Sequence, residues 1–582
     1  MTAPRAVLEM VADVRVSGAS GNGVSDDTTA VQAAITRVNA AGGGTVFFPR
    51  GTYVVSSLNI PGPNIAFVGA PGSTLDHKAG ATLPIFYRAQ GLSLISNLLF
   101  DGLTLIGNGN DTGTEQTKAG IFVFYSTDVI VRNCTITDFA RSAVHLATCL
   151  RAKIIDNTLQ RCSLIASGDN VVHLDLDPSN KQSVKYGDYV VSGNEITDFN
   201  NGGIIIGTSL ALDTAIRARA IVTQNIIRAG AAFAGVACEG GFTDGLVISE
   251  NVIDDCLKGV TLNVPTFGFG AIPHVQNAVV SDNQIDGSGL ALSVGINSLA
   301  SYATITGNTV RTRGNCIATA SPGSGGEPSH CVIANNSVVC VNTDGAQTPT
   351  CISLNPLNDS VVQGNTLEFT NAGGDTAAGL LYVKNCNRTL IARNTIKNAR
   401  RCGIFMDTGC NNVTITGNRV WQANFGNLSK SSIQVSAGTD IILEANETIY
   451  TAGTGTAHVA GIYVSGTPTR VFLRNNISYG SSGGAFQKDT AGAIVEDRGN
   501  KKSTTHIPNG GVFSSTPGAV AVVNIAHGLH AAPTVFAASR SGANSRGAPA
   551  FDITADATNI ILTFAANLTA ATVYDWAWMA FL

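Results

Sequence analysis

The sequence predicts an all-β fold, a parallel β-helix in which each turn of a solenoid is built from short strands. The first observation is a phrase of the form apolar, x, apolar, x, x, Asn, x, apolar, which recurs thirteen times. The second is its spacing of 24 to 37 residues, which suits two or three short strands per turn. The third is a composition that is low in charge (13%) and rich in glycine (64 of 582), without the amphipathic periods of helical repeats. The asparagines of the phrase are Asn133, Asn157, Asn194, Asn225, Asn251, Asn283, Asn308, Asn336, Asn365, Asn394, Asn418, Asn446 and Asn475.

Each phrase is expected to form a strand, a sharp corner and a second strand. Alternating apolar residues bury one face of a strand. Asparagine tolerates the left-handed backbone conformation that a tight corner demands. Because the coils stack, each asparagine side chain is also placed to hydrogen-bond to the next one, so the sequence predicts an asparagine ladder.

The two ends of the solenoid are predicted to differ from its middle. Residues 26–41 carry an amphipathic helical pattern, with Ala30, Ala34 and Val38 at helical spacing and Asp26 or Asp27 at the N-cap. An open stack of strands exposes sheet edges, so we expect this helix to cap the first coil. The sequence therefore divides into an N-terminal segment with its capping helix (1–45), the β-helix (46–502), and a small C-terminal, sandwich-like β-domain (503–582).

Three segments near the start carry a family resemblance. GNGVSDDTTAVQAAI, GGGTVFFPRGTY and FDGLTL closely resemble the beginning of the pectate-lyase-like superfamily of right-handed parallel β-helices. The resemblance implies a right-handed solenoid. It leaves the chemistry open, because the superfamily includes lyases, hydrolases, epimerases, fructan-processing transferases and phage tailspikes.

The last residues carry a second resemblance. The segments IAHGL, APTVFAAS, FDITADATNIILTF and YDWAWMA resemble the C-terminal β-domains of phage tail fibres and tailspikes. This resemblance implies trimerisation or binding by the domain, and hence a homotrimer. The first residues, MTAPRAVLEMVADVRV, lack the basic and apolar regions of a signal peptide. We therefore expect a phage tail or virion location with release by lysis, or otherwise a cytoplasmic protein.

Composition excludes several classes of partner. The formal net charge is −4 and the pI is about 6.1, which argue against a nucleic-acid-binding surface. The apolar runs are too short for a transmembrane helix, so membrane insertion is not expected. The twelve cysteines, from Cys134 to Cys410, show no metal-binding spacing and are expected to be buried thiols. We expect no metal and no cofactor.

The strands after the asparagine phrases predict two outward columns of side chains, because residues two apart on a strand share a face. The first column comprises Phe122, His145, His173, Ile205, Ala237 and Thr261. The second comprises Phe124, Ala147, Asp175, Gly207, Glu239, Asn263 and Asn297. The segment VVHLDLD thus places His173, Asp175 and Asp177 on one face, and Glu239 two coils beyond Asp175.

This arrangement predicts a glycoside hydrolase that uses two carboxylates. Backbones two coils apart are separated by about 9–10 Å, which is compatible with the gap of about 6.5–9.5 Å between the carboxylates of inverting glycosidases. One carboxylic acid would protonate the leaving oxygen while the other carboxylate activates water, and their mutual repulsion raises the pKa of one of them. The predicted catalytic residues are Asp175 and Glu239, assisted by Asp177 and His173.

The neighbouring side chains predict contacts with a polysaccharide or oligosaccharide substrate. The 37-residue interval from Asn157 to Asn194 and the 31-residue interval from Asn194 to Asn225 flank the same strand, and long insertions on one face of a solenoid often form its binding site. The predicted substrate-binding residues are His145, the aromatic residues Phe122, Phe124 and Tyr125, the basic residues Lys185, Arg217 and Arg219, and Asn263.

Three alternatives remain open at the level of the sequence. A polysaccharide lyase of the same fold would hold Ca²⁺ on Asp175 and Asp177 and use Lys185 or Arg219 as its base. A fructan-type transferase would share the scaffold. A non-catalytic receptor-binding tail protein would keep the binding surface without the chemistry. The sequence does not name the sugar or its linkage.

Overall fold

The fold is seen in a computed structural model, which describes most of the chain. The described residues are 10–89, 93–109, 119–165, 170–175, 186–207, 217–239, 245–262, 275–291, 293–319, 327–341, 350–370, 379–423, 430–450, 460–480, 486–488, 494–503, 510–515, 522–526, 535–540, 551–556, 559–565, 568 and 574–581. The chain divides into two compact units, residues 1–341 and 342–582, and each is described by itself.

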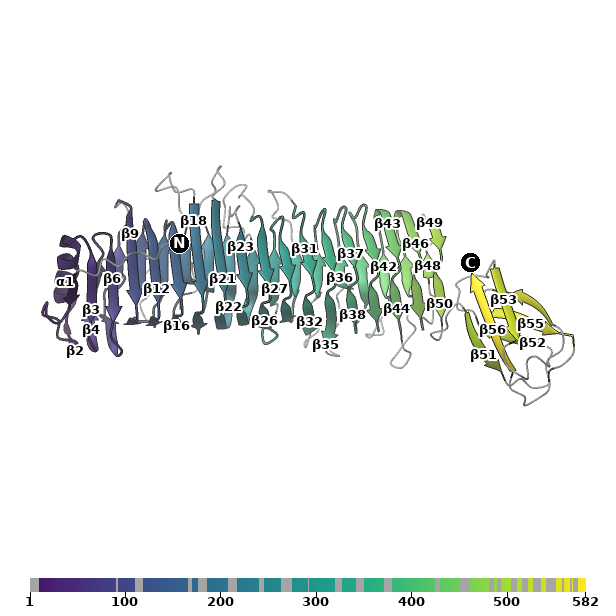
Figure 1. Cartoon of the computed structure of the whole chain (residues 1–582), viewed down its shortest axis with the longest axis horizontal. Helices are drawn as coiled ribbons and strands as arrows, with labels where there is room; N and C mark the ends of the chain where they lie inside the picture. The colour runs from purple at the N-terminus through teal and green to yellow at the C-terminus, as the bar shows by residue number, and fades with distance from the viewer. Residues whose placement is uncertain are drawn as a thin grey trace. The chain divides into compact units, whose positions relative to one another are not determined.

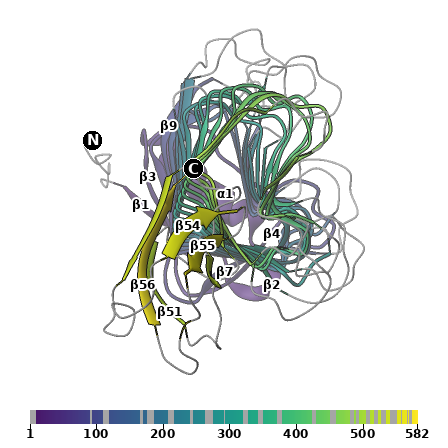
Figure 2. The same ribbon diagram turned by 90° about the vertical axis from the view of Figure 1, so that its right-hand side faces the viewer.

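The first unit is a stack of coils, each built from three strands that pair in parallel with the equivalent strands of neighbouring coils (Figures 1 and 2). We call the three sets of paired strands row 1, row 2 and row 3. Row 1 comprises β1 (Val11–Asp13), β3 (Gly44–Phe48), β6 (Ile65–Gly69), β9 (Ile95–Asp101), β12 (Ser126–Arg132), β15 (Arg151–Ile155), β18 (Tyr186–Ser192), β21 (Arg217–Thr223), β23 (Leu246–Ser249), β25 (Ala278–Ser281), β28 (Thr304–Thr306) and β31 (Val332–Ala334). Row 2 comprises β2 (Asn22–Asp26), β4 (Gly51–Val55), β7 (Ser73–His77), β10 (Thr104–Ile106), β13 (Thr135–Thr137), β16 (Thr158–Gln160), β19 (Glu195–Thr197), β26 (Gln284–Gly287), β29 (Thr309–Thr312) and β32 (Ser337–Val341). Row 3 comprises β5 (Leu58–Asn59), β8 (Phe86–Arg88), β11 (Ile121–Phe124), β14 (Val144–Ala147), β17 (Asn170–Asp175), β20 (Gly202–Gly207), β27 (Val294–Ser298) and β30 (Ile317–Thr319), while β22 (Ile226–Glu239) and β24 (Val252–Leu262) run through rows 2 and 3.

The second unit has the same three rows, followed by a separate group of antiparallel strands. Row 1 comprises β34 (Val361–Gln363), β37 (Leu390–Ala392), β40 (Thr414–Thr416), β43 (Thr439–Glu444), β46 (Thr469–Arg474) and β49 (Ile494–Arg498). Row 2 comprises β35 (Thr366–Thr370), β38 (Thr395–Lys397), β41 (Arg419–Trp421), β44 (Glu447–Ile449), β47 (Ile477–Tyr479) and β50 (Lys501–Ser503). Row 3 comprises β33 (Ile352–Leu354), β36 (Gly379–Val383), β39 (Cys402–Met406), β42 (Ile433–Val435), β45 (Ile462–Val464) and β48 (Phe486–Lys488).

The antiparallel strands form two three-stranded sheets. One contains β51 (Gly510–Ser515), β56 (Tyr574–Phe581) and β53 (Val535–Arg540), and the other contains β52 (Val522–Ala526), β55 (Asn559–Phe564) and β54 (Phe551–Ala555). Alternating apolar residues of the second sheet, among them Ile525, Ile560 and Leu562, form a small core of their own. These strands therefore bury one face, as their period of two predicts.

The predicted asparagine ladder is present and lies at the corner between rows 1 and 2. Asn225 illustrates the pattern: its side-chain amide donates to Asn251 Oδ1 at 2.9 Å and to the backbone oxygen of Val191 at 2.9 Å. Within the first unit the ladder runs through Asn157, Asn194, Asn225, Asn251, Asn283, Asn308 and Asn336. Within the second unit it runs through Asn365, Asn394, Asn418, Asn446, Asn476 and Asn500.

Two of the predicted ladder positions are wrong by one residue. Asn133 lies outside the ladder, where Cys134 takes the equivalent place and donates its backbone N–H to Asn157 Oδ1. Asn475 is likewise the residue before the ladder, which contains Asn476. The asparagine of the phrase was expected to adopt the left-handed backbone conformation, and this was also wrong. The residue before each ladder asparagine adopts it instead, as at Glu250 (φ 56°). The ladder asparagine itself is selected for its buried hydrogen bonds.

The N-terminal helix α1 (Thr28–Ala40) lies within the predicted range and packs against β1, β3 and β5 at the first coils (Figure 1). Its buried face is Val31, Ala34, Ile35 and Val38, which confirms the predicted Ala34 and Val38, whereas the predicted Ala30 is only half-buried. Of the two predicted capping residues, Asp27 is the N-cap residue and makes no side-chain capping hydrogen bond, whereas Asp26 accepts the backbone N–H of Thr28 at 3.0 Å. Among the described residues, no helix has the length and apolarity needed to cross a membrane.

Candidate functional site

Row 3 aligns the side chains that the sequence predicts as the first column. The strand registers pair Phe122 with His145, His145 with His173, His173 with Ile205, Ile205 with Ala237, and Ala237 with Thr261. The six residues therefore stack on successive coils as predicted. The next member is Asn297, which pairs with Thr261, so its predicted place in the second column is wrong. The longer sequence interval before this coil shifts the spacing of the strand pattern along the chain.

The second column is confirmed through the position of Glu239. Phe124, Ala147 and Asp175 are in register on adjacent coils. Asp175 pairs with Gly207, and Gly207 pairs with Glu239 at the end of β22. The strand positions of the two acidic residues are therefore two coils apart with a glycine between them. For Glu239 and Arg217 the structure describes the strand position alone, and Asp177, Lys185 and Asn263 lie outside the described residues.

Many side chains of these two columns are buried instead of facing solvent. Phe122 is 6% exposed and Phe124 3%, and both pack with Ala147 and the half-buried Tyr87 and Tyr125. His145 is 1% exposed. The cause is composition, because apolar side chains at alternate positions of stacked strands can cover one another. The predicted aromatic platform for sugar stacking is thus a packed cluster in the structure.

The aromatic cluster includes a residue that the sequence analysis missed. Tyr87 of β8 is in register with Phe122, and their ring centroids are 5.8 Å apart. The signal was present in the segment PIFYR, which has the same alternation as the later strands. It was missed because that strand precedes the first asparagine phrase and was not aligned with the others.

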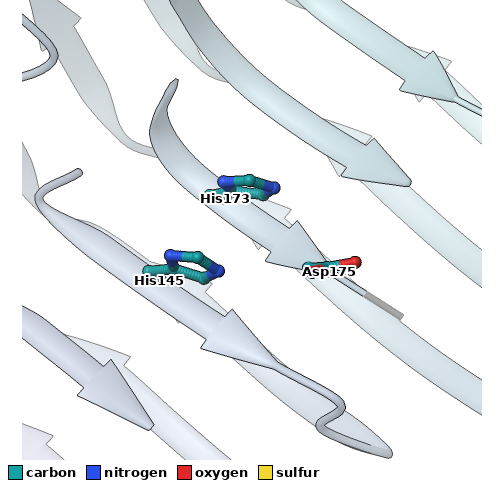
Figure 3. Close-up of side chains that lie close together, drawn as sticks. All are labelled: His145, His173 and Asp175. Atoms are coloured by element: carbon teal, nitrogen blue, oxygen red, sulfur yellow. The ribbon is translucent and has the colours of Figure 1, made fainter. Parts of the chain in front are cut away.

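Two histidines and one aspartate gather at the centre of the row (Figure 3). The imidazoles of His145 and His173 are parallel, with centroids 4.3 Å apart and an interplanar angle of 11°. The edge of Phe122 meets His145 at 4.9 Å. Asp175 lies on β17, two residues beyond His173, on the same side of the strand (Figure 3). The set thus brings a pair of proton-transfer groups next to one of the predicted carboxylates.

The surroundings of Asp175 combine burial with a neighbouring phenol. Tyr189 of β18 is buried and donates its hydroxyl proton to the backbone oxygen of Cys149. Burial raises the pKa of Tyr189 well above its ordinary value, and the negative charges of neighbours including Asp175 add to that rise. Tyr189 therefore stays protonated, and it acts here as a neutral hydrogen-bond donor that fixes the backbone beside the site.

The same three residues have the composition of a metal-binding set. One ligand atom from each of His145, His173 and Asp175 lies within 4.8 Å of the others. Two imidazole nitrogens with one carboxylate oxygen suit Zn²⁺ or a similar transition metal, whereas Ca²⁺ prefers oxygen ligands. Of the alternative Ca²⁺ pair, Asp175 belongs to this set and Asp177 lies outside the described residues.

Arg219 lies on a different part of the coil from Asp175. It belongs to β21 in row 1, where its guanidinium is 2.9 Å from Asp188 of the preceding coil. Asp188 is in register with Arg151, which in turn pairs with Asp128 at 2.6 Å. Acidic and basic side chains therefore alternate along an exposed column of row 1. Such exposed pairs contribute little stability individually.

Parallel coils in three rows, with an internal asparagine ladder, define the class of right-handed parallel β-helix proteins. Residues 11–261 match the family model described as rhamnogalacturonase A/epimerase, pectate lyase-like, and residues 272–448 match the right handed beta helix region. The chain is therefore a right-handed parallel β-helix protein, and its first part matches a pectate-lyase-like family model, as the resemblance predicted.

Several known proteins are similar to parts of the chain. Mannuronan C5-epimerase AlgE5 of Azotobacter vinelandii is 49% identical over 112 residues, which are 17% of this chain and 11% of the epimerase. An exopolygalacturonase of Zea mays is 29% identical over 191 residues, 32% of this chain and 45% of that protein. Among solved structures, a tailspike protein of E. coli bacteriophage HK620 in complex with a pentasaccharide is 11% identical with a TM-score of 0.46, covering 96% of this chain and 91% of that chain. By their names, the epimerase and the exopolygalacturonase act on polysaccharides, and the chain spans less than half of the length of each of them.

Proposed function

We propose that this protein binds a polysaccharide and cleaves it by hydrolysis, with Asp175 and Glu239 as its two catalytic carboxylates. The observation that carries the proposal is the register Asp175–Gly207–Glu239 in row 3. Strand positions two coils apart are separated by about 9–10 Å, and the glycine between them has no side chain to fill the space. This spacing is compatible with the carboxylate gap of inverting glycosidases, about 6.5–9.5 Å, which holds one water molecule.

The chemistry follows from the two carboxylates and their neighbours. One carboxylic acid protonates the glycosidic oxygen as the bond from that oxygen to the anomeric carbon breaks. The other carboxylate removes a proton from the water that attacks the anomeric carbon. His173, next to Asp175 on β17, is placed to influence its protonation, and Asp177 is proposed to assist. The family match and the polysaccharide-acting relatives support this class of substrate.

The test is an assay of new reducing ends with a panel of glycans, with the products identified by mass spectrometry. Hydrolysis adds one water per cleavage. Asp175→Asn and Glu239→Gln are each expected to lower the rate of cleavage at least 100-fold, since each removes a proton-transfer group. If both variants cleave at the wild-type rate, the assignment of the pair is refuted.

A second candidate is proton abstraction from an acidic sugar, and the stacked imidazoles of His145 and His173 favour it. A neutral imidazole would remove the proton next to the uronate carboxylate. Elimination of the C4–oxygen bond would then leave an unsaturated sugar, whereas return of a proton to the opposite face would give an epimer. The epimerase relative supports a uronan as substrate. Products that carry the ultraviolet absorbance of unsaturated uronates and no added water would favour elimination over hydrolysis.

The remaining proposals concern assembly and location. We propose a homotrimer and a phage-tail or lysis-released protein, on the basis of the C-terminal segments that resemble phage tail domains. Light scattering after gel filtration measures the mass directly. A protein that binds glycans without producing any new ends would instead be a receptor-binding tail protein, and glycosyl transfer to an added acceptor would indicate a transferase.

A further inference from the structure

We propose that the second unit carries a separate, non-catalytic binding face for acidic polysaccharides on row 3. The face is formed by a column of four side chains, Tyr382, Phe405, Gln434 and Tyr463, which we call the row 3 platform. The proposal depends on the proposed function only in taking a polysaccharide as the ligand. It is independent of the carboxylate pair in the first unit.

Strand pairing places the platform residues on successive coils. Tyr382 pairs with Phe405, Phe405 with Gln434, and Gln434 with Tyr463. The residues that alternate with them on the same strands, such as Leu381, Ile404 and Ile433, are fully buried in the solenoid core. The platform therefore points away from the core, and its members repeat at the coil spacing of about 4.8 Å.

The platform is partly open to solvent along its whole length, whereas the equivalent column of the first unit mixes buried and half-buried residues. All four of its residues are half-buried. The first unit's column contains Phe122 at 6%, His145 at 1% and Ala237 at 3% exposure. The first unit's column also has the half-buried Tyr87, but its neighbour Phe122 is buried, whereas Tyr382 and Phe405 are adjacent and both half-buried. Partly exposed aromatic rings are costly to leave in water and are frequent at ligand sites.

Polar groups are interleaved with the rings. The rings of Tyr382 and Phe405 are nearly parallel, with centroids 6.0 Å apart. The Tyr382 hydroxyl donates to Asp407 Oδ2 at 2.7 Å, and the Gln434 amide donates to Ser465 Oγ at 3.2 Å. The Gln434 amide also donates to Ser436 Oγ, and its Oε1 accepts from the Cys402 thiol. Both side chains are therefore held in place, and the Tyr382 hydroxyl oxygen and the Gln434 Oε1 retain acceptor capacity. Apolar rings next to fixed donors and acceptors match the alternating C–H and hydroxyl groups of a sugar chain.

Two basic side chains that precede β39 and β42 favour an acidic sugar. Arg401 and Lys430 lie four residues before Phe405 and Gln434, respectively, and hence at equivalent positions of adjacent coils. Both are close enough to Cys402 for their positive charges to act on its thiol. The Cys402 thiol contacts Gln434 Oε1 of the platform at 3.4 Å. Two cations on neighbouring coils that both act on this thiol offer electrostatic complementarity to a chain of sugar carboxylates.

The binding test uses the full chain in an Asp175→Asn background, so that the ligand is not consumed. Polygalacturonate is the acidic probe and dextran the neutral probe. We expect polygalacturonate to bind at least tenfold more tightly than dextran. The double substitution Tyr382→Ala, Phe405→Ala should weaken polygalacturonate binding about tenfold or more, as loss of central aromatic contacts does at other interfaces. Arg401→Gln with Lys430→Gln should weaken binding of the acidic probe and leave that of dextran unchanged.

Trp421→Ala is the matched control, because Trp421 is an exposed aromatic residue of the same unit on β41 in row 2. It should bind polygalacturonate as the parent does, and thermal melts should show that every variant is folded. Unchanged binding by the folded Tyr382→Ala, Phe405→Ala variant overturns the proposal. A change of its oligomeric mass also overturns it, since the platform would then be a contact between copies of the chain. Cleavage that survives Asp175→Asn refutes the proposed catalytic pair and leaves the platform to be judged by binding alone.

Discussion

Replacing one ladder asparagine should destabilise the solenoid far more than replacing a polar residue beside it. Asn251 is 1% exposed, and its amide donates to Val222 O at 3.0 Å, Ser249 O at 3.0 Å and Asn283 Oδ1 at 2.9 Å. Its Oδ1 accepts from both the backbone N–H and the side-chain amide of Asn225, at 3.0 and 2.9 Å. The change Asn251→Ala removes all five of these hydrogen bonds in a buried corner.

The magnitude follows from the groups that are left without partners. The backbone N–H of Asn225 loses the acceptor it has in the ladder, and the oxygen of Val222 loses its amide donor. A buried polar group without a partner costs about 1–3 kcal/mol. Some relaxation and water entry are expected, so we predict a loss of about 2–4 kcal/mol in the free energy of unfolding.

The assay is denaturant unfolding followed by circular dichroism, with hydrogen exchange to locate the change. Since repeat proteins are stabilised mainly by contacts between neighbouring coils, faster exchange should be confined to the coils around residues 222–283. Gln284→Ala is the control, because Gln284 is exposed on the adjacent coil and should change stability by less than about 0.5 kcal/mol. A loss for Asn251→Ala as small as that of the control would refute the reasoning.

Three further predictions concern the backbone at Gly417, the buried thiols and the carboxylate of Asp26. Gly417 has a φ of 62°, and a Cβ added there would meet no atom closer than 3.6 Å. Gly417→Ala should therefore lower the free energy of unfolding by about 1–2 kcal/mol through backbone strain alone. An unchanged unfolding midpoint would contradict this. All twelve cysteines are buried, and burial raises the pKa of thiols such as that of Cys149 to about 12. A thiol reagent at pH 8 should therefore label the native protein slowly and the unfolded protein completely. Rapid labelling of the native protein would contradict this prediction. Hydrogen bonds from Lys78 and Thr28 lower the pKa of Asp26 from 3.8 to about 2, so its contribution to stability is present above pH 3.8 and is lost as the pH falls through about 2. Asp26→Asn should remove that part of the acid dependence, and identical acid-unfolding curves for the variant and the wild type would contradict it.

The sequence was sufficient to predict the fold because the same pattern of apolar residues and asparagine recurs in many coils. Alternating apolar residues and a corner asparagine specify a coil, and the coils can stack in only one register that keeps the asparagines together. The first column of row 3 could therefore be aligned correctly from Phe122 to Thr261. The alignment failed at Asn297, after an insertion, and at Asn133, where Cys134 replaces the ladder residue. Insertions and substitutions break a repeat locally without breaking the stack.

What the sequence by itself determined is the period of the solenoid, the positions of its buried faces and the coil-to-coil alignment of Asp175 with Glu239. These are properties of a strand pattern with a period of two, and such a pattern is read directly from the order of residues. Only the tertiary structure decided which outward side chains meet water. It buries Phe122, Phe124 and His145, and it leaves Tyr382 and Phe405 partly exposed, although all of these residues alternate with core residues in the same way. The physical reason is that exposure depends on neighbours from other coils, and these neighbours are set by packing in three dimensions rather than by the spacing along one strand.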